Sequence, residues 1–149
     1  MLKKQVKEQL NTLLIAYFAV KDALVETDSK TAKYNAGELV ATLAKVENNL
    51  MTDSQKKLWE ENVAKLKTDA ENIGKTDDVE MQRIHFEGVS NALFLIISSF
   101  KANTATVYQQ FCPMAFNNKG GAWLSDKKEI RNPYFGDKML KCGSVKQEF

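Results

Sequence analysis

The sequence contains few of the residues on which catalytic sites and disulfide scaffolds are usually built. Among its 149 residues there are two cysteines, one histidine and two prolines. Two cysteines without C-x-x-C spacing do not make a disulfide scaffold, and one histidine leaves a cysteine nucleophile a single candidate base. A glycine-rich phosphate loop, a serine nucleophile elbow and an H-E-x-x-H pattern are also missing. We therefore expect a protein that is not an enzyme.

Long runs of apolar residues or of one charge are absent too. The 21 basic and 19 acidic residues are well mixed and leave a formal charge of +2, so we expect no nucleic acid partner. No stretch approaches the roughly 18 unbroken apolar residues of a membrane span. Charged residues flank the apolar patch at residues 13–20, which has helical spacing and is a poor secretory signal. These residues leave the compartment open.

The composition that remains suits one folded domain. Hydrophobic residues make up 44% of the chain and charged residues 27%, as in an ordinary globular protein. The length supports one core and is too short for two domains. We therefore treat residues 1–149 as a single domain.

Four amphipathic helices are indicated before residue 103 by apolar residues that recur at spacings of three and four. Capping residues at 27–29, 52–53 and 76–78 separate them, and Gly74 is placed to end the third. Helices of about 20 residues with short connections predict an up-down four-helix bundle over about residues 6–102. The predicted buried faces are Leu10, Leu13, Tyr17, Val20 and Leu24; Ala32, Ala36, Leu39, Leu43, Val46 and Leu50; Trp59, Val63, Leu66, Ala70 and Ile73; and Phe86, Val89, Leu93, Ile96 and Phe100.

Gly37 lies inside the second predicted helix, where glycine costs about 1 kcal/mol relative to alanine. Close packing of two helices is the simplest explanation for a glycine at this position. We expect Gly37 to face another helix.

The helical pattern stops near Asn103, and residues 103–149 read as a C-terminal irregular lobe that packs on the bundle. Residues 106–111 and 122–125 predict the two strands of a short β-hairpin around a turn at 117–121. Asn132 and Pro133 suit the start of a short helix over 134–140. Arg131, Asn132 and Asp137 are expected to be architectural, through capping and ion pairs within the lobe. The fold class is thus mainly α, a four-helix bundle with a lobe containing a β-hairpin and a short helix.

Both cysteines lie in this lobe, each near a methionine. Pro113 pushes Cys112 towards an extended conformation, and in an extended run Cys112 and Met114 point the same way. Met139 and Cys142 are three residues apart and share a face if the turn is helical. The spacing therefore predicts two pairs, each with one thiolate and one thioether.

Thiolate and thioether are soft ligands, which favours Cu(I), with Ag(I) as its chemical mimic. Zn(II) is less suited because methionine is not among its usual ligands, and Ca(II) and Mg(II) need clustered oxygen atoms. Cys112, Met114, Met139 and Cys142 are accordingly candidate metal ligands. His85, one helical turn after Met81, is a weaker candidate, because a lone helix histidine is more often a surface or hydrogen-bonded residue.

A structural interpretation competes with the metal site. A buried methionine more often fills a core, and two cysteines in an exported protein more often form a disulfide. A Cys112–Cys142 bridge would close a loop of about 30 residues and stabilise the fold by roughly 3–4 kcal/mol. Trp123, Tyr134 and Phe135 would then be exposed and face a protein partner. Both interpretations hold together if redox state switches the site, since a disulfide does not ligate as two thiolates.

Several stretches of the chain resemble one bacterial envelope family. They are Cys-Pro-Met-Ala at 112–115, Gly-Ala-Trp-Leu-Ser at 121–125, the run from Ile-Arg-Asn-Pro to Lys-Cys-Gly at 130–143, and the helical blocks 17–24 and 82–86. The family they resemble is the domain of unknown function numbered 3347, common in Bacteroidetes-type genomes. Similar domains are fused to heavy-metal efflux adaptor proteins of the copper/silver type.

The resemblance implies a periplasmic or lipoprotein setting and a role in handling copper or a related metal. Its implied partners are a metal ion and an efflux adaptor or other envelope protein. Carried onto this chain motif by motif, it makes Cys112, Met114, Met139 and Cys142 the candidate ligands, with His85 as a weaker fifth.

Overall fold

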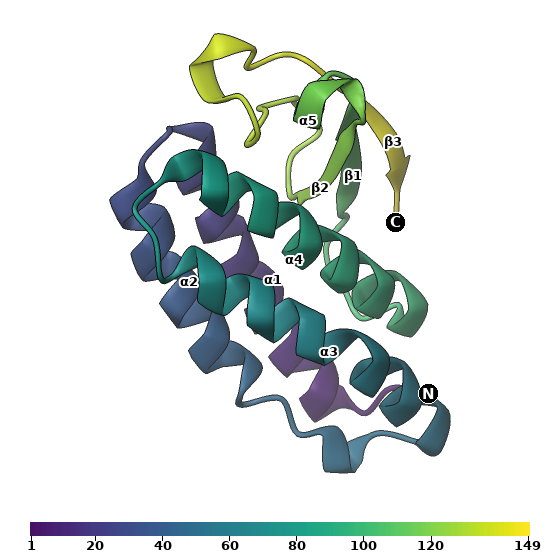
Figure 1. Cartoon of the computed structure of the whole chain (residues 1–149). Coiled ribbons are helices and arrows are strands. Elements are labelled where there is room, and N and C mark those ends of the chain that lie inside the picture. The colour runs from purple at the N-terminus through teal and green to yellow at the C-terminus, as the bar shows by residue number, and fades with distance from the viewer.

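The computed structural model describes all 149 residues and contains a bundle of four long helices. They are α1 (Lys4–Val25), α2 (Ser29–Leu43), α3 (Asp53–Ile73) and α4 (Val79–Phe100), with a short 3₁₀ turn, η1 (Asn48–Leu50), before α3. Consecutive helices run up and down beside one another (Figure 1). None of them has the length and apolarity that a membrane-spanning helix needs. The predicted bundle is confirmed.

Side-chain caps begin three of the helices at the predicted breaks. The Asp28 carboxylate accepts a hydrogen bond from the Thr31 backbone N–H, and Asp78 accepts from those of Glu80 and Met81. Thr52 and Gln55 form a reciprocal capping box at the start of α3. These bonds satisfy N–H groups that have no partner inside the helix, so the helices begin where the short polar residues stand.

The second helix is shorter than its apolar pattern predicts. It ends at Leu43, and the backbone then folds into tight turns in which Val46 N–H donates to the Leu43 carbonyl. Val46 and Leu50 still pack against the core from this connection. The prediction for Gly37 is wrong: this residue is exposed, with no neighbour near the position a Cβ would take. The close helix approach occurs at Gly88, where a Cβ would collide with the Asp69 carboxylate.

The C-terminal lobe contains a three-stranded antiparallel sheet. Strands β1 (Tyr108–Cys112) and β2 (Gly121–Ser125) form the predicted hairpin, with Cys112 opposite Gly121. A short turn labelled α5 (Ala115–Asn118) lies between them. A third strand, β3 (Ser144–Glu148), pairs with the other edge of β1 and was not predicted, because its polar, exposed residues have no apolar alternation.

The helix predicted over residues 134–140 is wrong in type and length. Only a 3₁₀ turn forms there, η2 (Gly136–Lys138), preceded by a turn that Asn132 caps. Gly136 has φ +60°, a left-handed conformation that interrupts a regular helix. The capping role predicted for Asn132 is confirmed, since its side-chain oxygen accepts from the backbone N–H groups of Tyr134 and Phe135.

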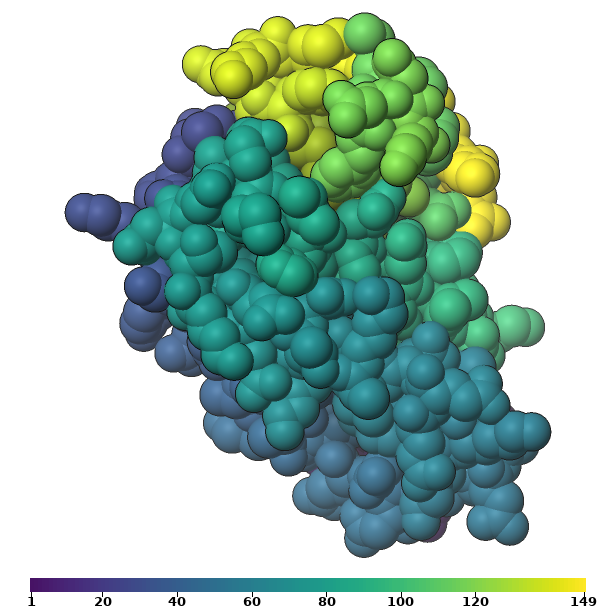
Figure 2. All heavy atoms as spheres, viewed as in Figure 1, coloured from purple at the N-terminus to yellow at the C-terminus, as the bar shows by residue number.

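Aromatic side chains join the lobe to the bundle. Tyr17 of α1 stacks on Phe86 of α4 with ring centroids 5.0 Å apart, and Tyr134 of the lobe lies 6.1 Å from Phe86. Trp123 packs edge-on to Tyr134 at 5.7 Å. Trp123 is 1% exposed and Tyr134 4%, so the prediction that they face a partner protein is wrong. The lobe forms one continuous surface with α4 (Figure 2).

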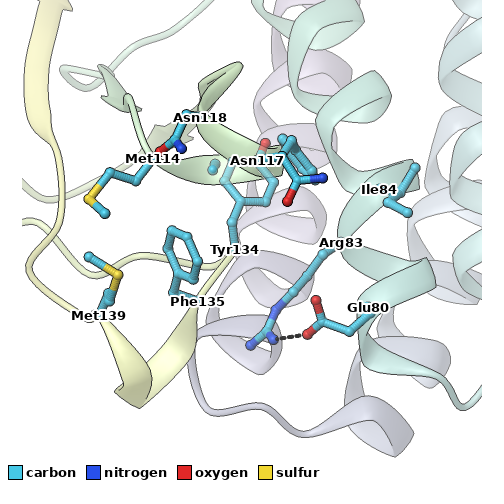
Figure 3. Close-up of a pocket in the computed structure, with 11 residues that line it drawn as sticks. Glu80, Arg83, Ile84, Met114, Asn117, Asn118, Tyr134, Phe135 and Met139 are labelled. Atoms are coloured by element: carbon cyan, nitrogen blue, oxygen red, sulfur yellow. Dashed lines mark hydrogen bonds and ion pairs between the residues drawn. The ribbon is translucent and has the colours of Figure 1, made fainter.

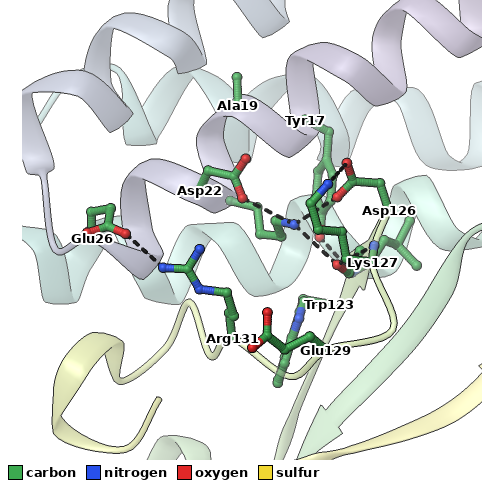
Figure 4. Close-up of polar contacts among 12 residues, drawn as sticks. Tyr17, Ala19, Asp22, Glu26, Trp123, Asp126, Lys127, Glu129 and Arg131 are labelled. Carbon is green, nitrogen blue, oxygen red and sulfur yellow. Dashed lines mark hydrogen bonds and ion pairs between the residues drawn. The ribbon is translucent and has the colours of Figure 1, made fainter. Parts of the chain in front are cut away.

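Buried polar groups also connect the C-terminal lobe to the helical bundle. The Tyr17 hydroxyl accepts from the Leu124 backbone N–H at 2.9 Å and lies 2.7 Å from Ser90 Oγ. Lys21, only 5% exposed, donates to Ser125 Oγ at 3.2 Å. Nearby, an exposed ion pair of 2.9 Å links Arg131 to Glu26 at the end of α1, so the ion pair predicted within the lobe instead joins the lobe to the bundle (Figure 4).

Arg83 of α4 is the most heavily bonded side chain of the interface. Its guanidinium is 3% exposed and donates to the Pro133 carbonyl at 2.8 Å and the Leu24 carbonyl at 3.0 Å. It also pairs with Glu80 at 2.8 Å. One buried cation thus holds the end of α1 and residue 133 of the lobe against α4.

We predict opposite effects for alanine at two glycines. Gly136→Ala should lower the free energy of unfolding by about 2 kcal/mol or more, because φ is +60° and the new Cβ would crowd Arg83 and Thr27. Gly37→Ala, in an open helix position, should raise it by about 0.5–1 kcal/mol. Urea unfolding followed by circular dichroism measures both; equal effects of the two substitutions would contradict the structure.

Tyr17→Phe should destabilise the protein at neutral pH by about 1–3 kcal/mol, since the Leu124 N–H loses its acceptor. Burial raises the pKa of Tyr17 far above its ordinary value. Because the folded-state pKa exceeds the unfolded one, this tyrosine's contribution is complete below about pH 10 and is lost as the pH rises further. The difference in unfolding free energy between wild type and variant should therefore shrink as the pH rises from about 10 to about 11, just above the ordinary tyrosine pKa. Urea midpoints that stay parallel across this range would refute the assignment.

Candidate functional site

The two cysteines meet at the end of the sheet. Cys112 is the last residue of β1 and is fully buried, whereas Cys142 precedes β3 and is half-buried. Their Sγ atoms are 2.7 Å apart, and both are free thiols. The pairing of Phe111 with Ser144 in the β1–β3 ladder brings Cys142 to Cys112. The third strand, which the sequence did not reveal, therefore assembles the thiol pair.

The environment of Cys142 disfavours its thiolate. The hydrogen bond with the Cys112 thiol, burial and the charge of the neighbouring sulfur raise the pKa of Cys142. A hydrogen bond from the Met114 backbone N–H acts in the opposite direction. The pair is thus a dithiol that can lose two electrons and two protons to become a disulfide, or lose protons to ligate a metal.

The methionines do not pair with the cysteines as predicted. Met114 has φ −89° and ψ −11°, so the extended run ends before it, and its side chain is 46% exposed beside the buried Cys112. Met139 has φ −149° and ψ 56°, so it is not helical, although the Cys142 N–H donates to its carbonyl across a tight turn at 3.1 Å. The extended conformation predicted for Met114 and the helical turn predicted for Met139 and Cys142 are therefore wrong.

Met114 and Met139 instead lie together in a pocket between α4 and the lobe. The pocket has a volume of about 470 Å³. Figure 3 shows the two thioether groups pointing towards each other, with the Phe135 ring beside them and the Glu80–Arg83 ion pair at the other end. Its lining residues are Glu80, Arg83, Ile84, Met114, Ala115, Phe116, Asn117, Asn118, Tyr134, Phe135 and Met139. The lobe thus contains a thiol pair and a separate thioether pair.

A left-handed turn forms part of the pocket wall. Phe116, Asn117 and Asn118 have φ of 55°, 57° and 66°, a conformation that costs roughly 1–2 kcal/mol per L-residue. The Gly120 N–H closes the turn on the Ala115 carbonyl, and Phe116 packs edge-on to Tyr134 at 4.9 Å. The sequence indicated a turn here through its Asn and Gly residues, but nothing in it marked Phe116 as left-handed.

His85 lies apart from the sulfur atoms. Its Nδ1 is 3.2 Å from Asp69 Oδ1 of α3, and the other carboxylate oxygen of Asp69 accepts from Lys65 at 3.0 Å. His85 faces this neighbouring helix, and neither it nor Met81 lines the pocket. The structure therefore does not bring His85 to the other four predicted ligands.

No three His, Cys, Asp or Glu side chains gather in a way that could hold a metal ion. The sulfur atoms of two cysteines and two methionines are soft donor atoms and remain the candidate ligands of the lobe.

Comparison with known proteins gives one match. The sequence model of the family described as "Protein of unknown function (DUF3347)" matches residues 13–105. That segment spans the helices and contains the blocks 17–24 and 82–86, whereas the lobe motifs after residue 105 lie outside it. No curated protein and no solved structure matches the chain.

The thiol geometry predicts that mild oxidation closes one intramolecular disulfide, because both Sγ atoms are already in contact. The intact mass should fall by two hydrogens and alkylation should stop. Closing the 30-residue separation between the cysteines should stabilise the fold by roughly 3 kcal/mol. Urea unfolding with and without reductant measures this, and Cys142→Ser should show no such difference. Intermolecular dimers in place of the internal bridge would contradict the geometry.

Proposed function

For this chain, which belongs to the DUF3347 family, we propose that the C-terminal lobe binds a soft monovalent metal ion through sulfur, with Cu(I) as the natural ligand and Ag(I) as its mimic. The observation that carries the proposal is the gathering of four sulfur atoms in two pairs on one lobe.

The donor chemistry explains the choice of ion. Cys112 and Cys142 supply sulfurs that carry negative charge once deprotonated, and Met114 and Met139 supply neutral thioethers. Both kinds are soft, so Cu(I) and Ag(I) are favoured over Zn(II). His85 is left out of the ligand set because it faces Asp69 of α3 and does not line the pocket that holds Met114 and Met139.

The proposal includes a cellular role. The chain would hold or pass metal ions in the bacterial envelope, as a periplasmic protein or a lipoprotein, together with an efflux adaptor or another envelope protein. This cellular role is proposed because the motifs of the chain resemble those of the envelope family. In an oxidising envelope compartment the two thiols can close to a disulfide, and their redox state then decides whether they can bind the ion.

A second candidate function is a structural lobe with a Cys112–Cys142 staple that serves protein contacts. The 2.7 Å sulfur contact favours it, since a disulfide needs little movement from that position. Its contact surface would not be Trp123 or Tyr134, which are buried. The exposed apolar side chains beside the pocket, Ile84 and Met114, would be the surface available.

Competition with a colorimetric Cu(I) chelator on the fully reduced protein tests the proposal, with Zn(II) titrated in parallel. We expect one Cu(I) per chain and Zn(II) affinity at least about 100-fold weaker, the difference that soft ligands supply. A variant lacking all four sulfurs, C112S/C142S/M114L/M139L, should lose at least about tenfold in affinity, or 1.4 kcal/mol.

The matched control is Met81→Leu, which removes an exposed thioether of α4 that does not line the pocket. It should bind like the wild type. Circular dichroism and urea unfolding establish that each variant is folded. Absence of Cu(I) binding by the reduced wild type, or unchanged binding by the four-sulfur variant, would leave the structural staple as the function of the lobe.

A further inference from the structure

The structure separates the four sulfur atoms into two environments. The thiols are in direct contact at the end of the sheet, and Cys112 has no exposed surface. The thioethers line a pocket that solvent enters, and Met114 is 46% exposed. An ion that arrives from solution therefore meets methionine first.

The thiol pair is poorly placed to receive an ion from solution. Cys112 has no exposed surface and is enclosed by the core, and the two Sγ atoms contact each other. Oxidation to a disulfide needs little movement from this arrangement.

The thioether pair has none of these restrictions. A thioether carries no proton, so it binds a cation without the deprotonation that a thiol needs. The Phe135 ring lies beside the two methionines, where a cation gains from the face of an aromatic ring at up to about 6 Å (Figure 3). Asn117 and Asn118 add amide groups to the same wall, held there by the left-handed turn.

We propose that Met114 and Met139 form a thioether site for a soft monovalent d¹⁰ cation that works without the thiols, which can remain closed as a disulfide. The inference rests on the proposed function and assigns it to one pair of sulfurs. Uncharged thioethers discriminate strongly against Zn(II), and binding at this site is independent of redox state.

The test uses the full chain in its oxidised form, with the internal disulfide verified by intact mass and by the absence of alkylation. Ag(I) is the probe because the assay conditions do not reduce or oxidise it. Isothermal titration should give one Ag(I) per oxidised chain. M114L/M139L, which keeps side-chain volume, should lose at least about tenfold in affinity, while M81L stays unchanged. Phe135→Leu should lose a few-fold through the cation–π contact.

A spectroscopic readout locates the ion independently of affinity. The chain has five methionines, so the ¹³C-methyl spectrum of methionine-labelled protein should contain five signals. Ag(I) should shift the signals of Met114 and Met139 in the oxidised protein and leave those of Met1, Met51 and Met81 in place.

The outcomes distinguish this inference from the proposed function. If reduced protein binds the ion and oxidised protein does not, the thiols are the site, so the proposed function stands and the thioether site is wrong. If neither form binds, both are wrong. Wild-type affinity in folded M114L/M139L, or methyl shifts at Met1, Met51 or Met81 alone, would overturn the thioether site.

Discussion

The buried guanidinium of Arg83 is the interaction on which the arrangement of the lobe depends. A charge at 3% exposure is costly unless its donors are satisfied, and here they reach the Leu24 and Pro133 carbonyls and the Glu80 carboxylate. The Leu24 carbonyl belongs to the last turn of α1, where a cation is also favoured by the helix dipole. The bond from Arg83 holds Pro133 beside α4. Position 136 requires glycine because its φ is +60° and a Cβ there would crowd Arg83.

The rest of the lobe packs around the residues that Arg83 holds in place. Tyr134 packs against Phe86 of α4 and Trp123 of β2, and together with Tyr17 of α1 these rings form an aromatic core. The sheet then places Cys112 inside and leaves Met114 at the surface. One face of the lobe is therefore buried and contains Cys112, and the other borders the pocket that holds Met114 and Met139 (Figure 3).

The helices, their caps and the hairpin could be predicted because their signals are local. Apolar residues three and four apart, short polar residues at helix starts and alternation in the first strand act within a few residues of one another. The wrong predictions concern residues whose environment is set by groups far away in the sequence. Gly37 looked like a packing glycine although Gly88 has that role, and Trp123 looked exposed although it closes the core.

The sequence by itself determined the donor atoms of the candidate site, the helical bundle and the positions of the chain breaks, since these depend on residue type and short spacing. The tertiary structure alone decided which sulfur lies next to which. Cys142 reaches Cys112 only through the pairing of β1 with β3, a strand without a hydrophobic pattern. Met114 reaches Met139 only because the backbone leaves the extended and helical conformations on which the spacing rules depend.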